Sequence, residues 1–222
     1  MKEFINFNMD FSKKVVINTL EKEWIDSPES QVKRIPLERS GEESGHVTSV
    51  VEYKKGAAFK EHSHPLGEEI LVLEGVFSDE TGDFPAGTYI RNPPGSRHSP
   101  FSKDGCKILV KLDQFNENDL ERVVINTHDE SLWRPGIGGL KVLPLHQYET
   151  ESCALVKWPK NENFQKHAHY GGEEIFVLSG TFIDEHGSYP KWTWLRSPHL
   201  STHHPRVDEE TLIYVKTGHL LK

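Results

Sequence analysis

The stretches His62–Glu68 (HSHPLGE) and His167–Glu173 (HAHYGGE) decide the fold, because each one opens a copy of the same pattern. In both copies, two histidines that are separated by one residue are followed by a glutamate, a glycine, a proline and a third histidine. A shift of 105 residues converts the first copy into the second without a gap. The first set is His62, His64, Glu68, Gly75, Pro85 and His98, and the second is His167, His169, Glu173, Gly180, Pro190 and His203.

The repeat extends over most of the chain. The segment VVINT occurs at Val15 and again at Val123, and the copies align without a gap over the residues from Val50 to Lys111. Self-similarity at a long fixed period indicates tandem copies of one structural unit. A chain of 222 residues has room for two domains of about 100 residues. We therefore expect an N-terminal arm at 1–14, a first domain at 15–118 and a second domain at 119–222.

The segments between turn signals predict strands. Short runs of strand-like composition recur in both copies, such as Val47–Tyr53 and Cys153–Trp158. Runs of this kind, bounded by Gly, Pro, Asn or Asp, are typical of strands. Ile70–Leu73 and Ile175–Leu178 are continuous apolar runs, as expected for strands that are buried on both faces. The sequence therefore predicts an all-β chain with little helix.

Charge and hydropathy exclude several classes of partner. The net charge is −8 and no run rich in Lys or Arg occurs, whereas binding to nucleic-acid phosphates requires a basic surface. The sequence has no apolar run long enough to span a membrane, and the N-terminus has no apolar stretch typical of a signal peptide. Cys106 and Cys153 occupy non-equivalent positions of the repeat. We expect two buried strand thiols and a location in the reducing cytoplasm.

The histidines and glutamates have the spacing of metal ligands. Residues i and i+2 of a strand project from the same face, so the two neighbouring histidines of each copy point together. Imidazole and carboxylate groups bind zinc and other divalent metals, and surface histidines have no physical reason to keep this spacing in two diverged copies. The sequence predicts one metal site in each copy. The expected ligands are His62, His64, Glu68, His98, His167, His169, Glu173 and His203.

Two features of these sites stay open at this level. Glu69 and Glu174 are also shared by the copies, and strand parity does not decide which glutamate is the ligand, because the following residues are apolar on both faces. Arg91 and Arg196 recur near the end of a strand. They are expected to form salt bridges between strands, with an anionic ligand or the ligand glutamate as alternative partners.

The motif spacing resembles that of the cupin superfamily. The first cupin motif matches Gly56, His62, His64, Glu68 and Gly75, and the second matches Pro85, Gly87 and His98. The matched motif selects Glu68 rather than Glu69. In the second copy Asn161 replaces the first glycine of the motif, and Trp192 replaces Gly87. The resemblance implies two tandem cupin domains, each a double-stranded β-helix or jelly-roll barrel with a metal inside.

The segment from Gly67 to His98 is closely similar to the cupin domain of ChrR-type anti-sigma factors. In that family the cupin half binds zinc and takes part in sensing oxidative stress. The resemblance implies one divalent cation per domain, with Zn²⁺ as the first choice and Fe²⁺, Mn²⁺ or Ni²⁺ as alternatives. Residues 1–14 contain neither Cys nor His, so we do not expect the sigma-factor binding of an N-terminal zinc module to carry over.

Two functions fit these residues. The first interpretation is a zinc-binding sensory or regulatory bicupin that responds to a small-molecule or oxidant ligand, because no catalytic base beyond the metal ligands is evident. The alternative is a non-haem Fe(II) enzyme, or its Mn or Zn counterpart, such as a small-ketone dioxygenase, because histidines and a carboxylate with open positions suit oxygen chemistry. A structural bicupin with vacant sites is a third interpretation. Edge strands also allow a homodimer.

Overall fold

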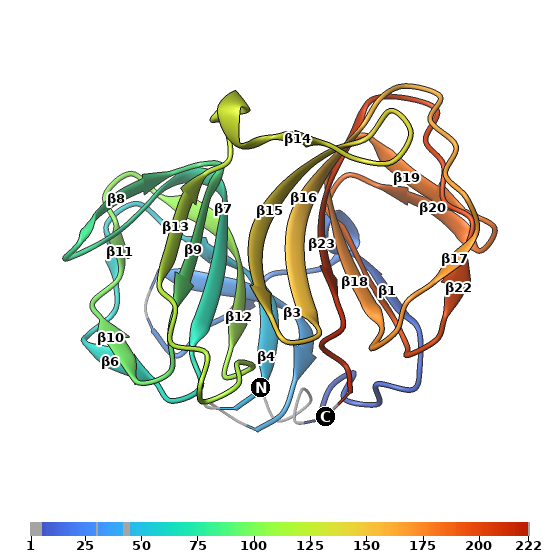
Figure 1. Cartoon of the computed structure of the whole chain (residues 1–222). Coiled ribbons are helices and arrows are strands. Elements are labelled where there is room, and N and C mark those ends of the chain that lie inside the picture. The colour runs from blue at the N-terminus through green and yellow to red at the C-terminus, as the bar shows by residue number, and fades with distance from the viewer. Residues whose placement is uncertain (1–5, 30, 42–44, 222) are drawn as a thin grey trace. The chain divides into compact units, whose positions relative to one another are not determined.

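The computed structural model describes residues 6–29, 31–41 and 45–221, which form two compact units (Figure 1). Unit 1 comprises the described parts of Met1–Met9 and Lys22–His128, and unit 2 comprises those of Asp10–Glu21 and Asp129–Lys222. Some residues of the expected arm and domains lie outside the described residues. They are residues 1–5, 30, 42–44 and 222.

Unit 1 contains the strands from β2 to β13. They are β2 (Ile25–Asp26), β3 (Val32–Arg39), β4 (Val47–Tyr53), β5 (Ala57–Ala58), β6 (His62–His64), β7 (Glu68–Asp79), β8 (Gly82–Pro85), β9 (Thr88–Asn92), β10 (Ser96–His98), β11 (Phe101–Ser102), β12 (Cys106–Leu112) and β13 (Val123–Asn126). The main sheet has the order β13-β9-β7-β12-β4-β3-β2, and β5, β8 and β11 join it off this path. Strands β6 and β10 form a separate antiparallel pair.

Unit 2 contains the other described elements. They are β1 (Val15–Asn18), η2 (Thr19–Glu21), η3 (Glu130–Leu132), β14 (Arg134–Pro135), β15 (Lys141–Tyr148), β16 (Glu151–Trp158), β17 (His167–Ala168), β18 (Glu173–Ser179), β19 (Thr181–Asp184), β20 (Gly187–Pro190), β21 (Thr193–Ser197), β22 (Thr202–His203) and β23 (Thr211–Thr217). The main sheet has the order β1-β21-β18-β23-β16-β15-β14, and β17–β22 and β19–β20 are separate pairs.

The all-β prediction is confirmed for the described residues, in which the only helical elements are the 3-10 helices η2 and η3. The run Val47–Tyr53 is β4, and Cys153–Trp158 falls within β16. Ile70, Leu71 and Val72 in β7 are almost completely buried, as expected for a strand with both faces covered. Across the described ranges, no helix is long and apolar enough to cross a membrane.

The boundaries of the compact units differ from those of the sequence repeats, because the first strand of each repeat belongs to the other unit. Strand β1 opens the first repeat but belongs to unit 2, where Val15 lies opposite Arg196 of β21. Strand β13 opens the second repeat but belongs to unit 1, where Val123 lies opposite Arg91 of β9. The VVINT segments offer the same residues to either edge. Each unit therefore takes an edge strand from the other repeat, in the same register.

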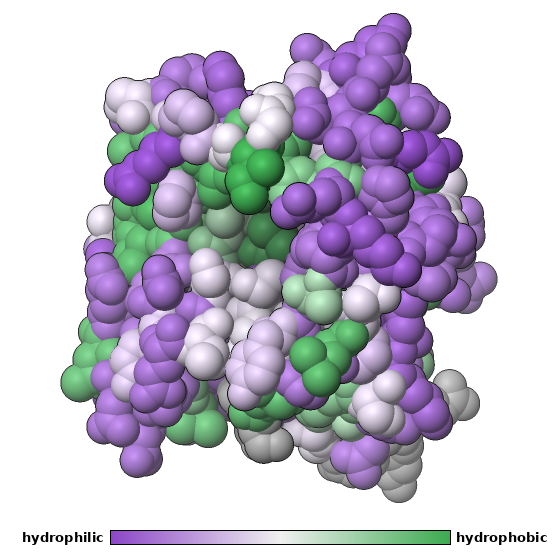
Figure 2. Space-filling model, turned by 45° about the vertical axis from the view of Figure 1, so that its right-hand side comes forward, coloured by the Kyte–Doolittle hydropathy of each residue, from purple (hydrophilic) through white to green (hydrophobic). Residues whose placement is uncertain are grey.

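Each unit has its own apolar core. Phe77 and Cys106 belong to a buried cluster in unit 1, and Phe182 belongs to the corresponding cluster in unit 2. Cys106 and Cys153 are both buried and neither forms a disulfide, as predicted. Figure 2 shows that hydrophilic side chains cover most of the face it presents, while hydrophobic side chains gather within a hollowed area. Burial of the apolar side chains is the main favourable term for folding each unit.

Two turn positions that the copies share explain why glycine recurs in the repeat. Gly75 and Gly180 both have a φ of 73°. A Cβ atom at these positions would lie 2.1 and 2.4 Å from a backbone carbonyl oxygen, so only glycine fits without displacement of the neighbouring strand. Asn161 and Trp192 replace other glycines of the first copy and keep a positive φ of 63° and 65°. The turn geometry is therefore retained even where the residue has changed.

Candidate metal centres

In unit 1, three histidines converge on one point. Strands β6 and β10 pair so that His98 lies opposite His62, and His64 shares a face of β6 with His62. The Nε2 atoms of His64 and His98 are 3.0 Å apart, and one ring nitrogen of each histidine lies within 4.8 Å of the others. The Glu68 carboxylate lies 3.6 Å from Nε2 of His64 and 3.4 Å from Nε2 of His98. The structure brings together all four residues that the sequence selected.

Unit 2 repeats this arrangement. Strands β17 and β22 place His203 opposite His167. The Nε2 atom of His203 lies 3.0 Å from Nε2 of His169 and 3.3 Å from Nε2 of His167. The Glu173 carboxylate lies 3.3 Å from Nε2 of His169 and 3.6 Å from Nε2 of His203. Each unit thus contains one group of three histidines that could hold a metal ion.

The orientation of the rings fits a divalent cation. Nδ1 of His62 lies 2.9 Å from the Lys60 carbonyl oxygen, and Nδ1 of His167 lies 2.9 Å from that of Gln165. A carbonyl only accepts, so Nδ1 donates the proton and Nε2 carries a lone pair. Lone pairs that converge repel one another unless a cation lies between them. Metal–nitrogen bonds of about 2.0–2.1 Å are compatible with the observed separations, so the residues present fit one cation in each unit.

Burial prepares these groups for metal binding. Loss of hydration, with the neighbouring His62, lowers the pKa of His64 to about 4. Burial, followed by the nearby histidines, lowers the pKa of His169 to about 3. Burial also raises the pKa of Glu68, and it raises that of Glu173 to about 7. The imidazoles of His64 and His169 are therefore neutral, which is the form that binds metals, and a bound cation would stabilise the charged form of each buried carboxylate.

An aspartate lies behind one histidine in each unit. The Asp79 carboxylate lies 3.4 Å from Nδ1 of His98. The Asp184 carboxylate lies 3.7 Å from Nδ1 of His203. A carboxylate on the ring nitrogen remote from a metal fixes the orientation of the imidazole and raises the basicity of the nitrogen that faces the metal. These aspartates act as positioning residues for the histidine clusters.

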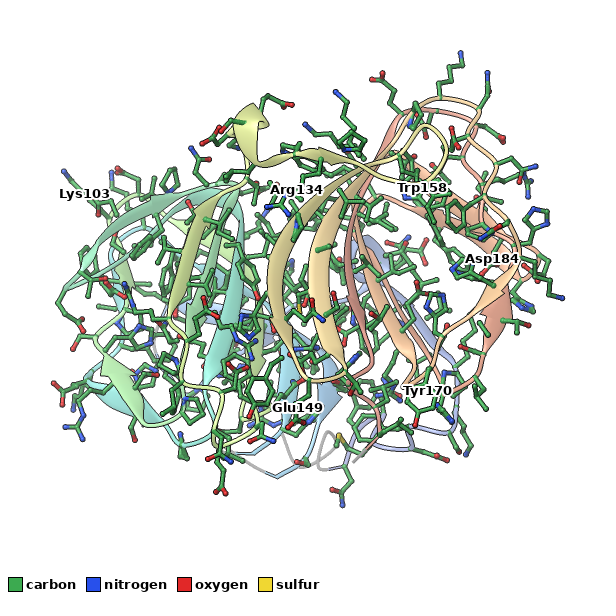
Figure 3. All side chains as sticks on the ribbon, viewed as in Figure 1. Lys103, Arg134, Glu149, Trp158, Tyr170 and Asp184 are labelled. Carbon is green, nitrogen blue, oxygen red and sulfur yellow. The ribbon has the colours of Figure 1, made fainter. Side chains whose placement is uncertain are left out.

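The surroundings of the two aspartates differ. In unit 2, Lys14 lies 3.4 Å from the Asp184 carboxylate, which also accepts a hydrogen bond of 2.9 Å from the Tyr189 hydroxyl. Asp184 is labelled in Figure 3. Both aspartates accept a hydrogen bond from a backbone N–H, that of Thr81 in unit 1 and that of His186 in unit 2, and Asp79 also accepts one from the Thr81 hydroxyl. The outer aspartate of unit 2 therefore has a cationic neighbour from the N-terminal segment.

The ambiguity between neighbouring glutamates is removed by their positions. Glu68 lies in the histidine cluster, whereas Glu69 lies opposite Arg91 in the β7–β9 pair. The Glu69 carboxylate is 3.5 Å from the Arg91 guanidinium, which is the salt bridge between strands that was expected. In unit 2, Glu174 accepts a hydrogen bond of 2.7 Å from Nε1 of Trp194. Glu174 also lies 3.2 Å from Nε2 of His219. The second glutamate of each repeat thus has partners outside the histidine cluster.

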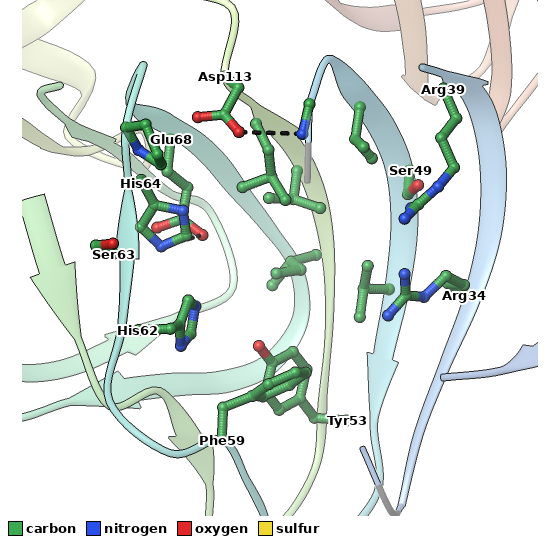
Figure 4. A pocket seen from close by; sticks show the side chains of 17 residues that line it. Arg34, Arg39, Ser49, Tyr53, Phe59, His62, Ser63, His64, Glu68 and Asp113 are labelled. Atoms are coloured by element: carbon green, nitrogen blue, oxygen red, sulfur yellow. Dashed lines mark hydrogen bonds and ion pairs between the residues drawn. The ribbon is translucent and has the colours of Figure 1, made fainter. Parts of the chain in front are cut away.

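A cavity adjoins the histidines of unit 1. Its volume is about 410 Å³, within the range of roughly 300–1,000 Å³ that is usual for small-molecule sites. His62, His64 and Glu68 form one side, and Arg34 and Arg39 of β3 lie on the opposite side (Figure 4). The cluster of unit 1 therefore faces a space that can hold a small molecule.

The corresponding cavity of unit 2 is smaller and more apolar. Its volume is about 310 Å³, and its wall includes His167, His169 and Glu173. Glu173 is the only Asp, Glu, Lys or Arg among the described residues that line it. Trp158, labelled in Figure 3, is part of this wall, at the position that Tyr53 has in unit 1. The two units combine the same donor groups with different walls.

Several residues of these sites were not selected from the sequence. Arg34 and Arg39 are matched by uncharged residues in the second copy, so a search for equivalent residues passes over them, whereas Lys14 is matched by the basic residue Arg122. Asp79 and Asp184 are related by the same shift of 105 residues as the ligands. That equivalence could have identified the aspartates from the sequence.

Comparison with known proteins agrees with this architecture. The family model of the ChrR cupin-like domain matches residues 12–116 and 120–221. No curated protein matches the sequence significantly. Similar solved structures include a candidate dioxygenase from Nostoc punctiforme, with a TM-score of 0.73 and 17% identity over 95% of this chain and 85% of that chain. The pirin YhhW of Escherichia coli, in complex with nickel(II), has a TM-score of 0.68 and 13% identity, covering 92% of this chain and 98% of its own.

A deletion mutant of the Bacillus subtilis oxalate decarboxylase OxdC is also similar, with a TM-score of 0.60 and 14% identity over 91% of this chain and 76% of that chain. At such identities the likeness shows the fold alone. The two family matches cover nearly the whole chain and coincide with the two repeats. The predicted tandem of cupin domains is confirmed by these matches, and the chain belongs to the family of ChrR cupin-like proteins.

Proposed function

We propose that the protein binds one divalent cation in each unit, and that the cation of unit 1 takes part in the chemistry of a small organic molecule. The observation that carries the proposal is the cavity of about 410 Å³ whose wall includes His62, His64 and Glu68. In structural metal sites the protein donors close the coordination sphere. Donors that form part of a cavity wall are instead typical of sites that keep positions for a ligand.

The donor set supports this function. Three imidazoles and one carboxylate supply four donors, which leaves two positions of an octahedral ion for a ligand. The bound cation would supply Lewis-acid polarisation of a ligand oxygen. Tyr53 lines the same cavity, and burial raises the pKa of its hydroxyl well above the usual value. The hydroxyl therefore stays protonated and can donate a hydrogen bond to a ligand oxygen.

Several metals suit these donors, because imidazole and carboxylate groups bind zinc, iron, manganese and nickel. Zinc is the metal implied by the resemblance to ChrR-type proteins. One similar structure is a complex with nickel(II), and another is named as a candidate dioxygenase. These names support including redox-active metals among the candidates. Iron in unit 1 would agree with the dioxygenase interpretation.

A zinc-dependent sensory or regulatory role is the second candidate, because the donors of unit 2 line a smaller cavity whose wall offers few polar groups to hold a ligand. The cavity there offers Glu173 as the only carboxylate and no Lys or Arg among its described lining residues. Three histidines and one glutamate can complete a tetrahedral zinc site. In this role, loss of the metal or oxidation near it would be the signal, and one chain would combine two kinds of site.

Metal analysis and oxygen consumption distinguish these functions. Bound iron together with oxygen uptake in the presence of 1,3-diketones would support the enzyme. Two zinc ions per chain without oxygen uptake would support the sensory role. Protein that binds no divalent metal after exposure to zinc, iron, manganese and nickel would contradict both.

A further inference from the structure

The sheet register of unit 2 builds an apolar wall around its cavity. Val156 of β16 lies opposite Ile213 of β23 on one side and opposite Val142 of β15 on the other. Residues that lie directly opposite one another in an antiparallel pair project from the same face of the sheet. All three side chains line the cavity. Neighbouring strands therefore present one apolar surface to the space that also adjoins the histidines.

Aromatic rings extend this surface. The ring centroids of Phe164 and Phe182 lie 5.9 and 5.5 Å from that of Trp158, and both contacts are edge-to-face. All three residues line the cavity. Edge-to-face packing is a favoured arrangement of aromatic rings and adds to the energy of their burial. The aromatic part of the wall is therefore held in place by its own packing.

Trp158 brings a hydrogen-bond donor without an acceptor into this wall. The residue is 5% exposed, and its buried Nε1 has no hydrogen-bond partner among the described residues. An indole N–H can only donate, and buried polar groups are nearly always hydrogen-bonded. Tyr53, at the matching place in unit 1, has a hydroxyl that can also donate. Both copies thus keep a donor at this position, although the residue has changed.

The rest of the wall favours an uncharged, mainly apolar ligand. Outside the histidine cluster, Thr217 and Trp158 are the only polar side chains among the described lining residues. Ile137 also lines the cavity but is 65% exposed, so it lies at the mouth, where an apolar ligand would cover it. Removal of apolar surface from water is favourable, whereas a charged group against an apolar wall loses its hydration without compensation.

The volume of the cavity limits the size of the ligand. An apolar cavity of about 150 Å³ binds one benzene molecule, and the cavity of unit 2 has a volume of about 310 Å³. On the same scale, three fused rings would need about 450 Å³. The cavity therefore has room for a molecule with two fused six-membered rings but not for one with three.

We propose that the cavity of unit 2 binds an uncharged, mainly apolar molecule of two-ring size with one oxygen acceptor, such as a bicyclic ketone. The rings of the ligand contact Phe164, Phe182 and Val156, and its oxygen accepts a hydrogen bond from Nε1 of Trp158. This ligand site goes beyond the metal chemistry proposed for unit 1, and the contacts that form it do not involve a cation.

Trp158 also borders a second cavity, which a test has to distinguish from the first. The wall of the second cavity, of about 440 Å³, includes Lys141, Lys157 and Glu210 and none of the histidines. These charged side chains make it the less suitable place for an apolar molecule. Lys141 lines only the second cavity and Val142 only the first, so substitutions at these two residues separate the cavities.

The test follows the indole N–H signal of Trp158 by nuclear magnetic resonance, in zinc-loaded and in metal-free protein. Trp158→Phe identifies this signal among those of the five tryptophans. α-Tetralone, a bicyclic ketone, is titrated beside tetralin, the hydrocarbon of nearly the same shape. Tetralone is expected to move the Trp158 signal downfield, as a new hydrogen bond does. Tetralin is expected to shift the methyl signals of Ile213 without this downfield change.

Variants locate the binding site. Trp158→Phe is expected to lower the affinity for tetralone relative to tetralin by about threefold to tenfold, the range for one neutral hydrogen bond. The methyl signals of Ile213 report binding in this variant, which lacks the indole. Val142→Phe fills the first cavity and is expected to prevent binding of both molecules there. Lys141→Met, the control in the second cavity, is expected to leave both affinities unchanged.

Three results would overturn the inference. Neither molecule moves the signals of Trp158 or Ile213 in either form of the protein, folded Trp158→Phe protein keeps the affinity ratio of the unchanged protein, or Lys141→Met removes binding that Val142→Phe leaves intact. Thermal unfolding establishes that each variant is folded, and the affinity ratio decides the matter if Val142→Phe does not fold. If unit 2 takes up no zinc, the proposed metal function fails there, and titration of the metal-free protein still decides this inference.

Discussion

The two metal centres have the same donors but different surroundings. In each unit, three histidines have ring nitrogens within 4.8 Å of one another, and a glutamate carboxylate lies 3.3–3.6 Å from two of these nitrogens. The wall of the cavity in unit 1 contains Arg34 and Arg39, whereas that of unit 2 has no Lys or Arg among its described residues. Donor groups must all be retained to hold one ion, because loss of one weakens the whole set. A change in one wall residue leaves the set of donor groups intact, so the wall residues were free to diverge after duplication.

The largest expected effect separates the two centres. His98→Ala and His203→Ala should each halve the metal content, because each removes one imidazole from only one cluster. Loss of a metal present at a hundredfold excess over its Kd would lower the free energy of unfolding by about 2.7 kcal/mol. Elemental analysis and thermal unfolding measure both effects. His186→Ala, at an exposed histidine, is the control, and loss of metal from both units in either variant would contradict independent sites.

The outer aspartates should affect the affinity of their own centre. Asp79→Asn and Asp184→Asn are each expected to lower metal affinity by about tenfold to a hundredfold in one unit, because they release the orientation of a ligand histidine. The effect should be larger for Asp184, which also contacts Lys14 and Tyr189. Competition with a chelator measures the affinities. Equal effects of both substitutions would show that the additional contacts of unit 2 do not influence the metal.

The centre of unit 2 should release its metal as the pH falls below about 7. Burial raises the pKa of Glu173 to about 7. For His203, burial acts to lower the pKa, but the contacts with Asp184 and Glu173 outweigh it and raise the pKa. Protons and metal compete for the same lone pairs, so both groups oppose metal binding at low pH. His169, with a pKa of about 3, contributes nothing in this range.

The expected decrease in affinity is about tenfold per pH unit for each group that takes up a proton. Chelator competition between pH 5 and 8, in the His98→Ala protein that keeps only the second centre, measures it. Glu173→Gln should make the pH dependence shallower. An affinity that stays constant from pH 7 to pH 5 would be the contrary result.

The smallest expected effect comes from the N-terminal segment. Lys14→Met should weaken metal binding in unit 2 by about two- to fivefold, because it removes one partly exposed ion pair from Asp184. Arg122 occupies the matching place in the second repeat, where it donates a hydrogen bond of 3.0 Å to the Thr81 hydroxyl. Arg122→Met is therefore the control. A change in the affinity of unit 1 on Lys14→Met would mean that the two centres are coupled.

The sequence predicted what depends on local spacing and could not predict what depends on register. The strands, the tandem repeat and the four clustered residues of each unit follow from short-range patterns. The arginines of the wall do not, because strand parity counted from Arg34 would place Arg39 on the opposite face. A bulge between Pro36 and Glu38 reverses the parity, and this is visible only when the neighbouring strand is paired.

The exchanged edge strands were also beyond the sequence. The two VVINT segments are identical, so either could pair with either edge, and nothing in their composition selects one. The equivalent registers of Val15 and Val123 show that both edges accept the same segment. Only the course of the connecting chain decides which copy each edge receives.

The exchange of edge strands between the two repeats has a consequence for the ancestry of the protein. A half-length gene product ending near residue 118 would keep the edge at β9 but lack β13, and it would carry β1 without its partner β21. Two such halves could complete their sheets by exchanging this strand, as in domain swapping. Fusion of two such genes would have placed the exchanged strand and the sheet edge that accepts it in one polypeptide. Cutting the fused gene at the repeat boundary should therefore yield halves that associate through open edges, and not two self-sufficient barrels.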